Sequence, residues 1–198
     1  MAMFFSSTSP GVRKELQRYC ELFSLAEKAC KRAEFINLEG LLFPAINQLR
    51  NAGHHMVRAS LADDEQQTLK EIQSAQGHVG RAIHEAYDAI ALYYIAQCDQ
   101  FTAEFKSIVI GEAYPDFLTE KRKLKNAKKA LETTTRTSAI ENDTGAKAAL
   151  IDTLEDVYNN FENAREELNK QKRKERAVAL ISLITLLLTA FGIVMKFC

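Results

Sequence analysis

Residues that form tight turns are scarce in this chain of 198 residues, which contains 8 glycines, 3 prolines and no tryptophan. All-β sandwiches and barrels need many turns, and glycine and proline most often form them, so this composition excludes those folds. No Walker-type phosphate-binding loop and no Gly-x-Gly-x-x-Gly motif occurs, which excludes the common nucleotide-binding classes. The sequence therefore predicts an all-α protein.

Excess charge and paired cysteines are also missing. Lys plus Arg and Asp plus Glu both number 26, so the formal net charge is zero, which argues against nucleic-acid binding by bulk positive charge. The four cysteines form no Cys-x-x-Cys pair; they are Cys20, Cys30, Cys98 and Cys198. The sequence therefore gives no sign of a zinc site or a disulfide framework. We expect reduced cysteines, no metal and no cofactor.

Apolar residues recur every three or four positions over most of the chain, which is the period of an amphipathic helix. The expected helices cover residues 12–33, 38–60, 63–108 and 117–133, with a break at 111–115 and a loop at 134–144. Asn37 is the expected N-cap of the second helix, in which Pro44 either starts the main segment or kinks it. Asp63 or Asp64 is the expected cap of the third.

The last helix, which Asp143 or Thr144 would open, carries the clearest apolar stripe in the chain. Its members alternate spacings of four and three, the a/d pattern of a coiled-coil seam; they are Leu150, Leu154, Val157, Phe161, Ala164 and Leu168. The stripe either packs against the rest of the head or forms a self-associating stalk. Because no Gly or Pro lies between it and residue 177, one helix is expected to continue beyond the head.

Residues 177–195 form an uncharged apolar run between Arg176 and Lys196. As a helix this run would span roughly 28 Å, close to the ~30 Å hydrocarbon core of a bilayer. A basic cluster precedes it, so the positive-inside bias predicts a single-pass, tail-anchored protein of the inner (cytoplasmic) membrane with its N-terminal head in the cytoplasm. The expected organisation is a helical-bundle head, an amphipathic, coiled-coil-like helix with a basic flank, and a single transmembrane helix, over residues 1–140, 141–176 and 177–195.

Histidines suited to acid–base chemistry lie within one short part of the chain; they are His54, His55, His78 and His84. Both segments that hold them also carry arginines. A histidine can move protons at neutral pH, and a guanidinium can neutralise the charge that develops on a phosphorane. Cleavage of RNA in this way uses the 2′-hydroxyl of the RNA as nucleophile, so these residue types point to cleavage without a metal.

One short motif resembles the ribonuclease motif of the HEPN superfamily, in which an Arg and a polar residue precede a His by several positions: Arg50-Asn51-Ala52-Gly53-His54-His55. The resemblance extends over roughly residues 12–135. It implies a small helical bundle that dimerises and brings two motifs into one cleft. It also implies an endoribonuclease or toxin of bacterial anti-phage, CRISPR-associated or toxin–antitoxin defence. Carried over, Arg50 would bind the scissile phosphate, Asn51 would orient the pair and His55 would act as acid or base.

Other polar residues have two interpretations each. His54 could substitute for His55, or it could form a solvated row with Arg50 and Arg58. A second group could line the same cleft or form an ion-pair ladder on its own helix; it contains His78, Arg81, Glu85 and Asp88. His84 is a further possible supporting residue of the site. A basic stretch could contact RNA or lipid headgroups or be a solvated face; it contains Lys121, Arg122, Lys123, Lys125, Lys128 and Lys129.

Two function classes therefore stay open. The first is a membrane-tethered, HEPN-like, metal-independent endoribonuclease, whose partners would be RNA, a membrane, one or more copies of the same chain and an unidentified regulator. The second is a non-catalytic membrane effector or adaptor that oligomerises through its helical head and perturbs the membrane or forms a pore. In that case Ser182, Thr185 and Thr189, on one face of the apolar run, would be its polar lining.

Overall fold

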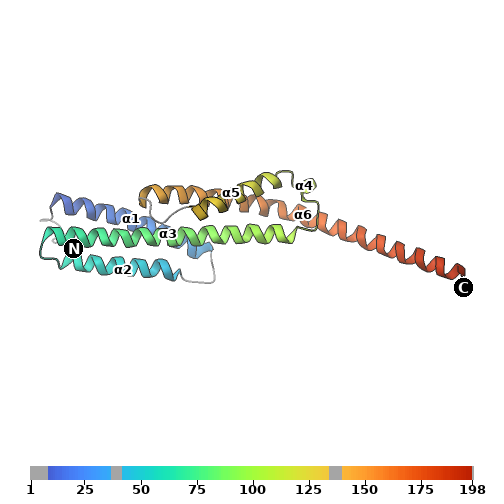
Figure 1. Ribbon diagram of the computed structural model, residues 1–198, viewed down its shortest axis with the longest axis horizontal. Coiled ribbons are helices and arrows are strands. Elements are labelled where there is room, and N and C mark those ends of the chain that lie inside the picture. Colours follow the sequence, from blue (N-terminus) through green and yellow to red (C-terminus); the bar gives the residue numbers. More distant parts are fainter. Residues whose placement is uncertain (1–8, 37–41, 134–139, 198) are drawn as a thin grey trace. The chain divides into compact units, whose positions relative to one another are not determined.

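The computed structural model describes residues 9–36, 42–133 and 140–197 of the chain. Helices joined by short connections account for these residues, which contain no strand, and the predicted all-α class is confirmed. The helices, coloured along the chain in Figure 1, are α1 (Pro10–Ile36), α2 (Phe43–Ser60), α3 (Glu65–Glu104), α4 (Ile110–Ala113), α5 (Phe117–Thr133) and α6 (Ile140–Phe197).

The starts of α2 and α3 follow from residues that suit a first helical turn. Pro44 lies in the first turn of α2, where the missing backbone N–H removes no helical hydrogen bond, so Pro44 starts this helix and does not kink it. At α3 the carboxylate of Asp64 accepts a hydrogen bond from the backbone N–H of Gln67 at 2.7 Å, so Asp64 is the N-cap. The other expected cap, Asn37, lies outside the described residues.

Several boundaries differ from those expected. α3 ends at Glu104, before the expected residue 108, and the helical turn α4 lies within the expected break. α6 begins at Ile140, inside the stretch expected to be a loop, of which residues 134–139 lie outside the described residues. Thr144 and Lys147 near the start of α6 are buried, so tertiary contacts outweigh the weak helix propensity of this polar stretch.

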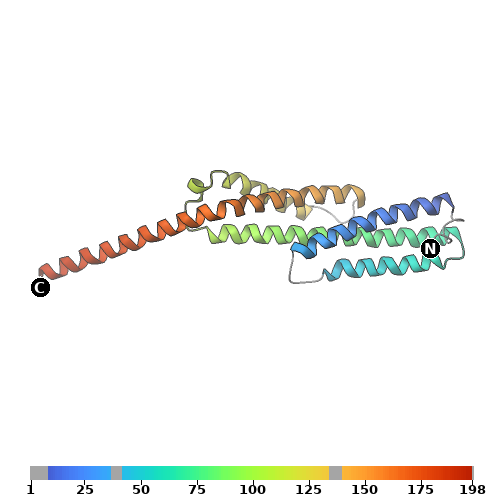
Figure 2. The same ribbon diagram turned by 180° about the vertical axis from the view of Figure 1, so that it is seen from behind.

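The chain divides into two compact units, of which unit 1 comprises residues 1–93 and 130–152. In both views α1 and α2 lie beside the first part of α3 (Figure 1, Figure 2). Small side chains dominate the contacts of α2, whose buried residues are Ala45, Ala52 and Ala59, seven positions apart. The start of α6 is attached by Lys147, whose Nζ lies 2.8 Å from Oδ1 of Asp88 on α3.

Unit 2 comprises residues 94–129 and 153–198 and has a core of large aromatic rings. Phe101 of α3 stacks on Phe161 of α6 with ring centroids 4.5 Å apart and an interplanar angle of 11°. Phe105 and Phe117 also contact this pair, and Phe101, Phe105 and Phe161 have no exposed surface. Over the rings of Phe101 and Phe105 lies the guanidinium of Arg165, which adds a cation–π contact.

The apolar stripe of α6 lies largely inside this chain. Leu154, Val157, Phe161 and Leu168 are fully buried, whereas Leu150 and Ala164 are partly exposed. Of the two alternatives that the stripe left open, packing within the chain is therefore the one observed. A free seam for a coiled-coil partner would require these side chains to be exposed.

No helix in the described residues is both long enough and apolar enough to cross a membrane, so the predicted transmembrane helix over 177–195 is wrong. α6 does continue through this run, but its side chains are described only as far as Thr189. Five charged residues, at 172–176, directly precede the run in the same helix.

Candidate functional site

The polar residues most suited to chemistry meet where α2 packs on α3. These helices form an antiparallel hairpin, so residues at equal sequence distances before and after Asp63 face each other. His55 and Glu71 are both eight positions from Asp63, and Gln48 and His78 are both fifteen. We call these four residues, Gln48, His55, Glu71 and His78, the histidine cluster; all of them belong to unit 1.

His55 is held by a carboxylate. Its Nδ1 lies 2.6 Å from Oε2 of Glu71, and the two side chains are 23% and 11% exposed. This hydrogen bond lowers the pKa of Glu71, and Arg58, whose Nε lies 3.7 Å from Oε1, acts in the same direction. With Nδ1–H donated to an ionised carboxylate, the other ring nitrogen, Nε2, is the position at which His55 can gain or release a proton.

His78 is held by an amide. Its Nδ1 lies 2.7 Å from Oε1 of Gln48, to which Nε of Arg81 also donates at 3.2 Å. An amide oxygen only accepts hydrogen bonds, so Nδ1 carries the hydrogen and the lone pair of neutral His78 is on Nε2. Burial lowers the pKa of His78, and the charge of Arg81 and the neighbouring His55 lower it further. His78 is therefore disposed to be the neutral, proton-accepting member of the cluster.

The two imidazoles contact each other directly. The rings of His55 and His78 stack with centroids 5.2 Å apart and an interplanar angle of 25°. The small side chain of the buried Ala52 lets the two helices approach closely enough for this contact. The result is a pair of histidines with different partners, one carboxylate and one amide, and with the exposed guanidinium side chains of Arg58 and Arg81 beside them.

The motif that resembles the HEPN superfamily is only partly included in this cluster. Arg50 and Asn51 are exposed, and within the described residues Arg50 makes no hydrogen bond or ion pair. Five positions of helix separate Arg50 from His55, so they project about 140° apart around the helix axis. His54 is also exposed, with its ring 6.4 Å from that of His55.

Two members of the second predicted group pair with residues of other helices. Arg81 donates to Gln48 of α2, and Asp88 pairs with Lys147 of α6. His84 is 6% exposed and lies about 240° around α3 from His78, so it belongs to another side of the helix. Of the predicted supporting residues, His78 contacts His55 and Arg81 shares Gln48 with His78, whereas His84 lies on another side of α3.

The basic stretch on α5 belongs to unit 2. Lys128 pairs with Asp99 at 2.6 Å, Lys123 pairs with Glu120 at 2.9 Å, and Lys121 lies over the ring of Phe117. Exposed basic side chains on this helix include Arg122, Lys125 and Lys129. Part of the stretch therefore has structural partners. For the exposed part, a solvated face and the binding of RNA or lipid phosphates both stay predictions.

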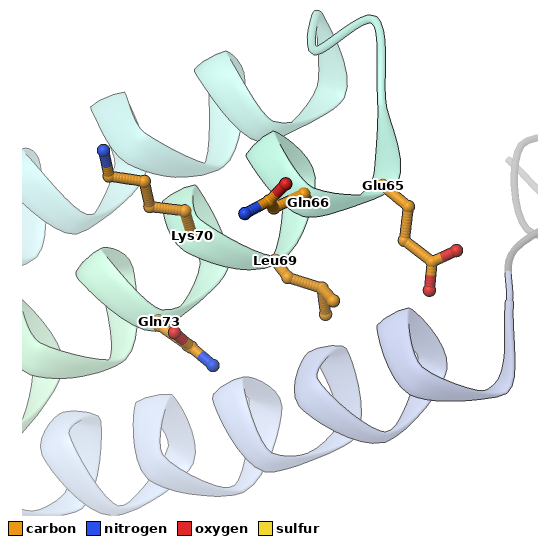
Figure 3. Close-up of a pocket in the computed structure, with 5 residues that line it drawn as sticks. All are labelled: Glu65, Gln66, Leu69, Lys70 and Gln73. Carbon is orange, nitrogen blue, oxygen red and sulfur yellow. The ribbon is translucent and has the colours of Figure 1, made fainter.

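A separate hollow of about 600 Å³ opens on α3, and its lining residues are Glu65, Gln66, Leu69, Lys70 and Gln73 (Figure 3). In the close-up, Leu69 and Glu65 point toward α1 and Lys70 points away from it. Leu69 packs on the small apolar cluster of Val12 and Ile72. The hollow holds no histidine and one acidic and one basic side chain at different ends, so we do not assign the chemistry to it.

Metal binding is limited by how the possible ligands are distributed. Nowhere in the part of the chain that the structure describes do three His, Cys, Asp or Glu side chains come together as a group that could hold a metal ion. Cys30 and Cys98 are buried, and burial raises the pKa of both thiols, that of Cys98 to about 12. These thiols are therefore poor nucleophiles and poor metal ligands at neutral pH.

Comparison with known proteins gives no relative from which a function could be transferred: no family model, no curated protein and no solved structure matches the chain. The resemblance of one short motif to the HEPN superfamily therefore stays a prediction. What the chain can do has to be inferred from its own side chains.

The sequence analysis missed Glu71 and Gln48. The signal that could have found them is the spacing of seven, or two helical turns, in the pairs Gln48–His55 and Glu71–His78. A short turn at residues 61–64 joins the two helices, so equal spacings on α2 and α3 place each histidine opposite a polar partner.

Proposed function

We propose that the histidine cluster is the acid–base site of a metal-independent endoribonuclease. The observation that carries this proposal is the direct contact of His55 and His78 in surroundings that differ. Cleavage of RNA through its 2′-hydroxyl needs one group that accepts a proton and one that donates a proton. A histidine beside a carboxylate and a histidine beside an amide and an arginine supply such a pair.

In this mechanism neutral His78 accepts the proton of the 2′-hydroxyl at Nε2 while the 2′-oxygen forms a bond to the adjacent phosphorus. The bond from phosphorus to the 5′-oxygen breaks, and protonated His55 donates its Nε2 proton to that leaving oxygen. The products are a 2′,3′-cyclic phosphate and a 5′-hydroxyl. Arg58 and Arg81 would neutralise the charge on the non-bridging oxygens.

The HEPN resemblance suggests a related site with a different composition. There Arg50 and Asn51 join His55, and a second copy of the chain supplies the second histidine. The two proposals share His55 and differ in His78 and Arg50, so substitutions at these two positions distinguish them. The cellular setting that the resemblance suggests, bacterial anti-phage or CRISPR-associated defence, stays a prediction. The location at the inner membrane was predicted from the apolar run and its basic flank, and it is likewise untested.

The test is RNA cleavage by the full chain in excess EDTA, with a matched substrate that carries a single 2′-deoxy nucleotide at the cleaved position. We expect cleavage of the RNA, a cyclic phosphate end and no cleavage at the deoxy position. His55→Gln should lower the rate by about 10² or more. The matched control is His54→Gln, the adjacent exposed histidine, which should keep the rate within about twofold of wild type.

Cleavage by the His55→Gln protein at the wild-type rate, or cleavage that is abolished by EDTA, would contradict this function. Cleavage of the 2′-deoxy position at the normal rate would do so as well, because the proposed nucleophile is then absent. Circular dichroism of each variant checks that the helices are intact.

A second function, that of a non-catalytic adaptor that self-associates, is favoured by residues 177–189 of α6. Large apolar side chains here are 48–66% exposed on all sides of the helix, and the hydroxyl groups of Thr185 and Thr189 donate to backbone carbonyls of their own helix. The same segment of a second chain would match this surface. The sedimentation coefficient of the wild type against Leu183→Gln/Leu187→Gln tests it: a monomer in both cases rules it out.

A further inference from the structure

A hollow of about 380 Å³ in unit 2 lies between the start of α5 and α6, remote in sequence from the histidine cluster. Three carboxylates, two amides and a phenol line it; they belong to Asp116, Glu120, Glu167, Asn160, Asn163 and Tyr114. We call it the acidic hollow. Most of its lining groups offer oxygen atoms that accept hydrogen bonds.

The charge inside the acidic hollow is negative. Burial raises the pKa of Tyr114 to about 12, and the charges of Glu120 and Asp116 contribute in the same direction. The neighbouring lysines compensate only part of this charge. Lys123, 48% exposed, bonds Oε1 of Glu120 at 2.9 Å, and Lys170 lies 3.5 Å from Glu167 while also pairing with Glu166.

Glu120 has an oxygen atom that needs a donor. Its side chain is only 6% exposed, and within the described residues its Oε2 atom has no hydrogen-bond partner. A buried carboxylate oxygen without a partner is destabilising by more than a neutral group would be, so native proteins rarely leave one unpaired. Glu120 lines the hollow and its Oε2 atom is buried, so a ligand there can supply the missing N–H group once the Glu120 side chain turns toward it.

The arrangement of the carboxylates indicates which kind of cation fits. A bound metal ion would need them to converge on one point, and no group of three among the described residues does so. An organic cation with several ammonium groups along a chain does not need convergence, since each ammonium has three N–H donors and no acceptor. We propose that the acidic hollow binds a small linear polyamine, with one ammonium group on Glu120 and another on Glu167.

The probe is spermidine, titrated into the full chain by isothermal calorimetry. We expect one saturable site and a weakening of at least about tenfold in Glu167→Gln, because each substitution removes one charge-assisted contact. The matched control is Glu166→Gln, which removes the same charge one position away. Glu166 also pairs with Lys170 and is 84% exposed, but it does not line the hollow. The affinity of the Glu166→Gln protein for spermidine should therefore stay within about twofold of wild type.

Glu120→Gln should also weaken binding by at least about tenfold. Because Glu120 is buried, the helix content of the Glu120→Gln protein is compared with that of wild type. If this variant unfolds, Glu167→Gln gives the decisive result. Three outcomes overturn the proposal: no saturable binding of spermidine, equal affinities of Glu167→Gln and Glu166→Gln, or displacement of spermidine by an equimolar amount of Mg²⁺. None of them bears on RNA cleavage.

Discussion

α3 makes two helix–helix contacts of opposite kinds. In unit 2 its Phe101 stacks on Phe161 of α6, and both rings are fully buried. In unit 1 it meets α2 through the buried Ala52 and through the stacked imidazoles of His55 and His78, of which His55 is 23% exposed. One contact is large, apolar and dry, and the other is small, polar and open to solvent.

The different composition of the two contacts indicates that they have different roles, one in stability and one in chemistry. Burial of large rings is the efficient way to stabilise a helix pair, because each ring removes much apolar surface from water. Two histidines, a carboxylate and an amide contribute little to stability in a partly exposed position. Such a set places proton-transfer groups within reach of a substrate, and we therefore interpret the unit 2 contact as structural and the α2–α3 contact as functional.

The largest effect on stability is expected in unit 2. Phe161→Ala should lower the free energy of unfolding by about 3–5 kcal/mol, because it removes a fully buried ring and leaves a cavity. Urea denaturation measures this loss. Phe35→Ala, a ring that is 83% exposed on α1, is the control and should change stability by less than about 0.5 kcal/mol. Equal losses in the two variants would contradict the assignment of the core.

A smaller effect is expected when the α2–α3 contact is overpacked. Ala52 has no exposed surface, so Ala52→Leu should cost about 1–3 kcal/mol and push the helices apart. The stacked histidines would separate, and RNA cleavage should fall by more than the loss of folded protein accounts for. A variant that is destabilised in urea but cleaves at the full rate would show that the contact of the two rings is unnecessary.

Gly53, next to Ala52, gives an effect of the opposite sign. A Cβ atom added there meets no atom within 4 Å among those that the structure describes, and the residue lies inside α2. Gly53→Ala should therefore raise the free energy of unfolding by about 0.5–1 kcal/mol. This differs from the close backbone approach that a glycine within a helix suggests. A loss of stability in thermal unfolding would show that α2 is more crowded than described.

The smallest effect concerns pH. The pKa of His78 is lowered from 6.5 in the folded chain, so the unfolded chain binds this proton more readily. The contribution of neutral His78 to the free energy of unfolding is fully present above the pKa of His78 in the unfolded chain, and it decreases as the pH falls below that pKa. Between about pH 7.5 and pH 5, wild type should therefore lose more stability than His78→Gln, measured by urea denaturation at each pH. Parallel losses would contradict the lowered pKa.

Much of the fold could be predicted from the sequence because apolar periodicity and capping residues act locally. Asp64 and Pro44 have the predicted roles in starting helices. The start of α6 at Ile140 could not be predicted, because it depends on the burial of Lys147 against Asp88 on another helix. The transmembrane prediction used the uncharged length of residues 177–195 and the basic cluster before it, and no helix in the described residues is long and apolar enough to cross a membrane.

The candidate site could be predicted only in part. His55, His78 and Arg81 were identified as candidates from residue type, because the chain has only 4 histidines and arginines accompany them in both segments. Their partners could not be identified from type, since Glu71 and Gln48 become distinctive only when the hairpin places them opposite the two histidines. Motif similarity gave weight to Arg50, which the helix directs away from His55.

The most direct test of the account compares His78→Gln with Arg50→Ala in RNA cleavage by the full chain at neutral pH in EDTA. If the His55–His78 pair is the acid–base site, His78→Gln lowers the rate by about 10² or more, and Arg50→Ala keeps it within about threefold of wild type. The opposite pattern, with the rate retained in His78→Gln and lost in Arg50→Ala, would contradict the account and leave the HEPN-like motif as the site.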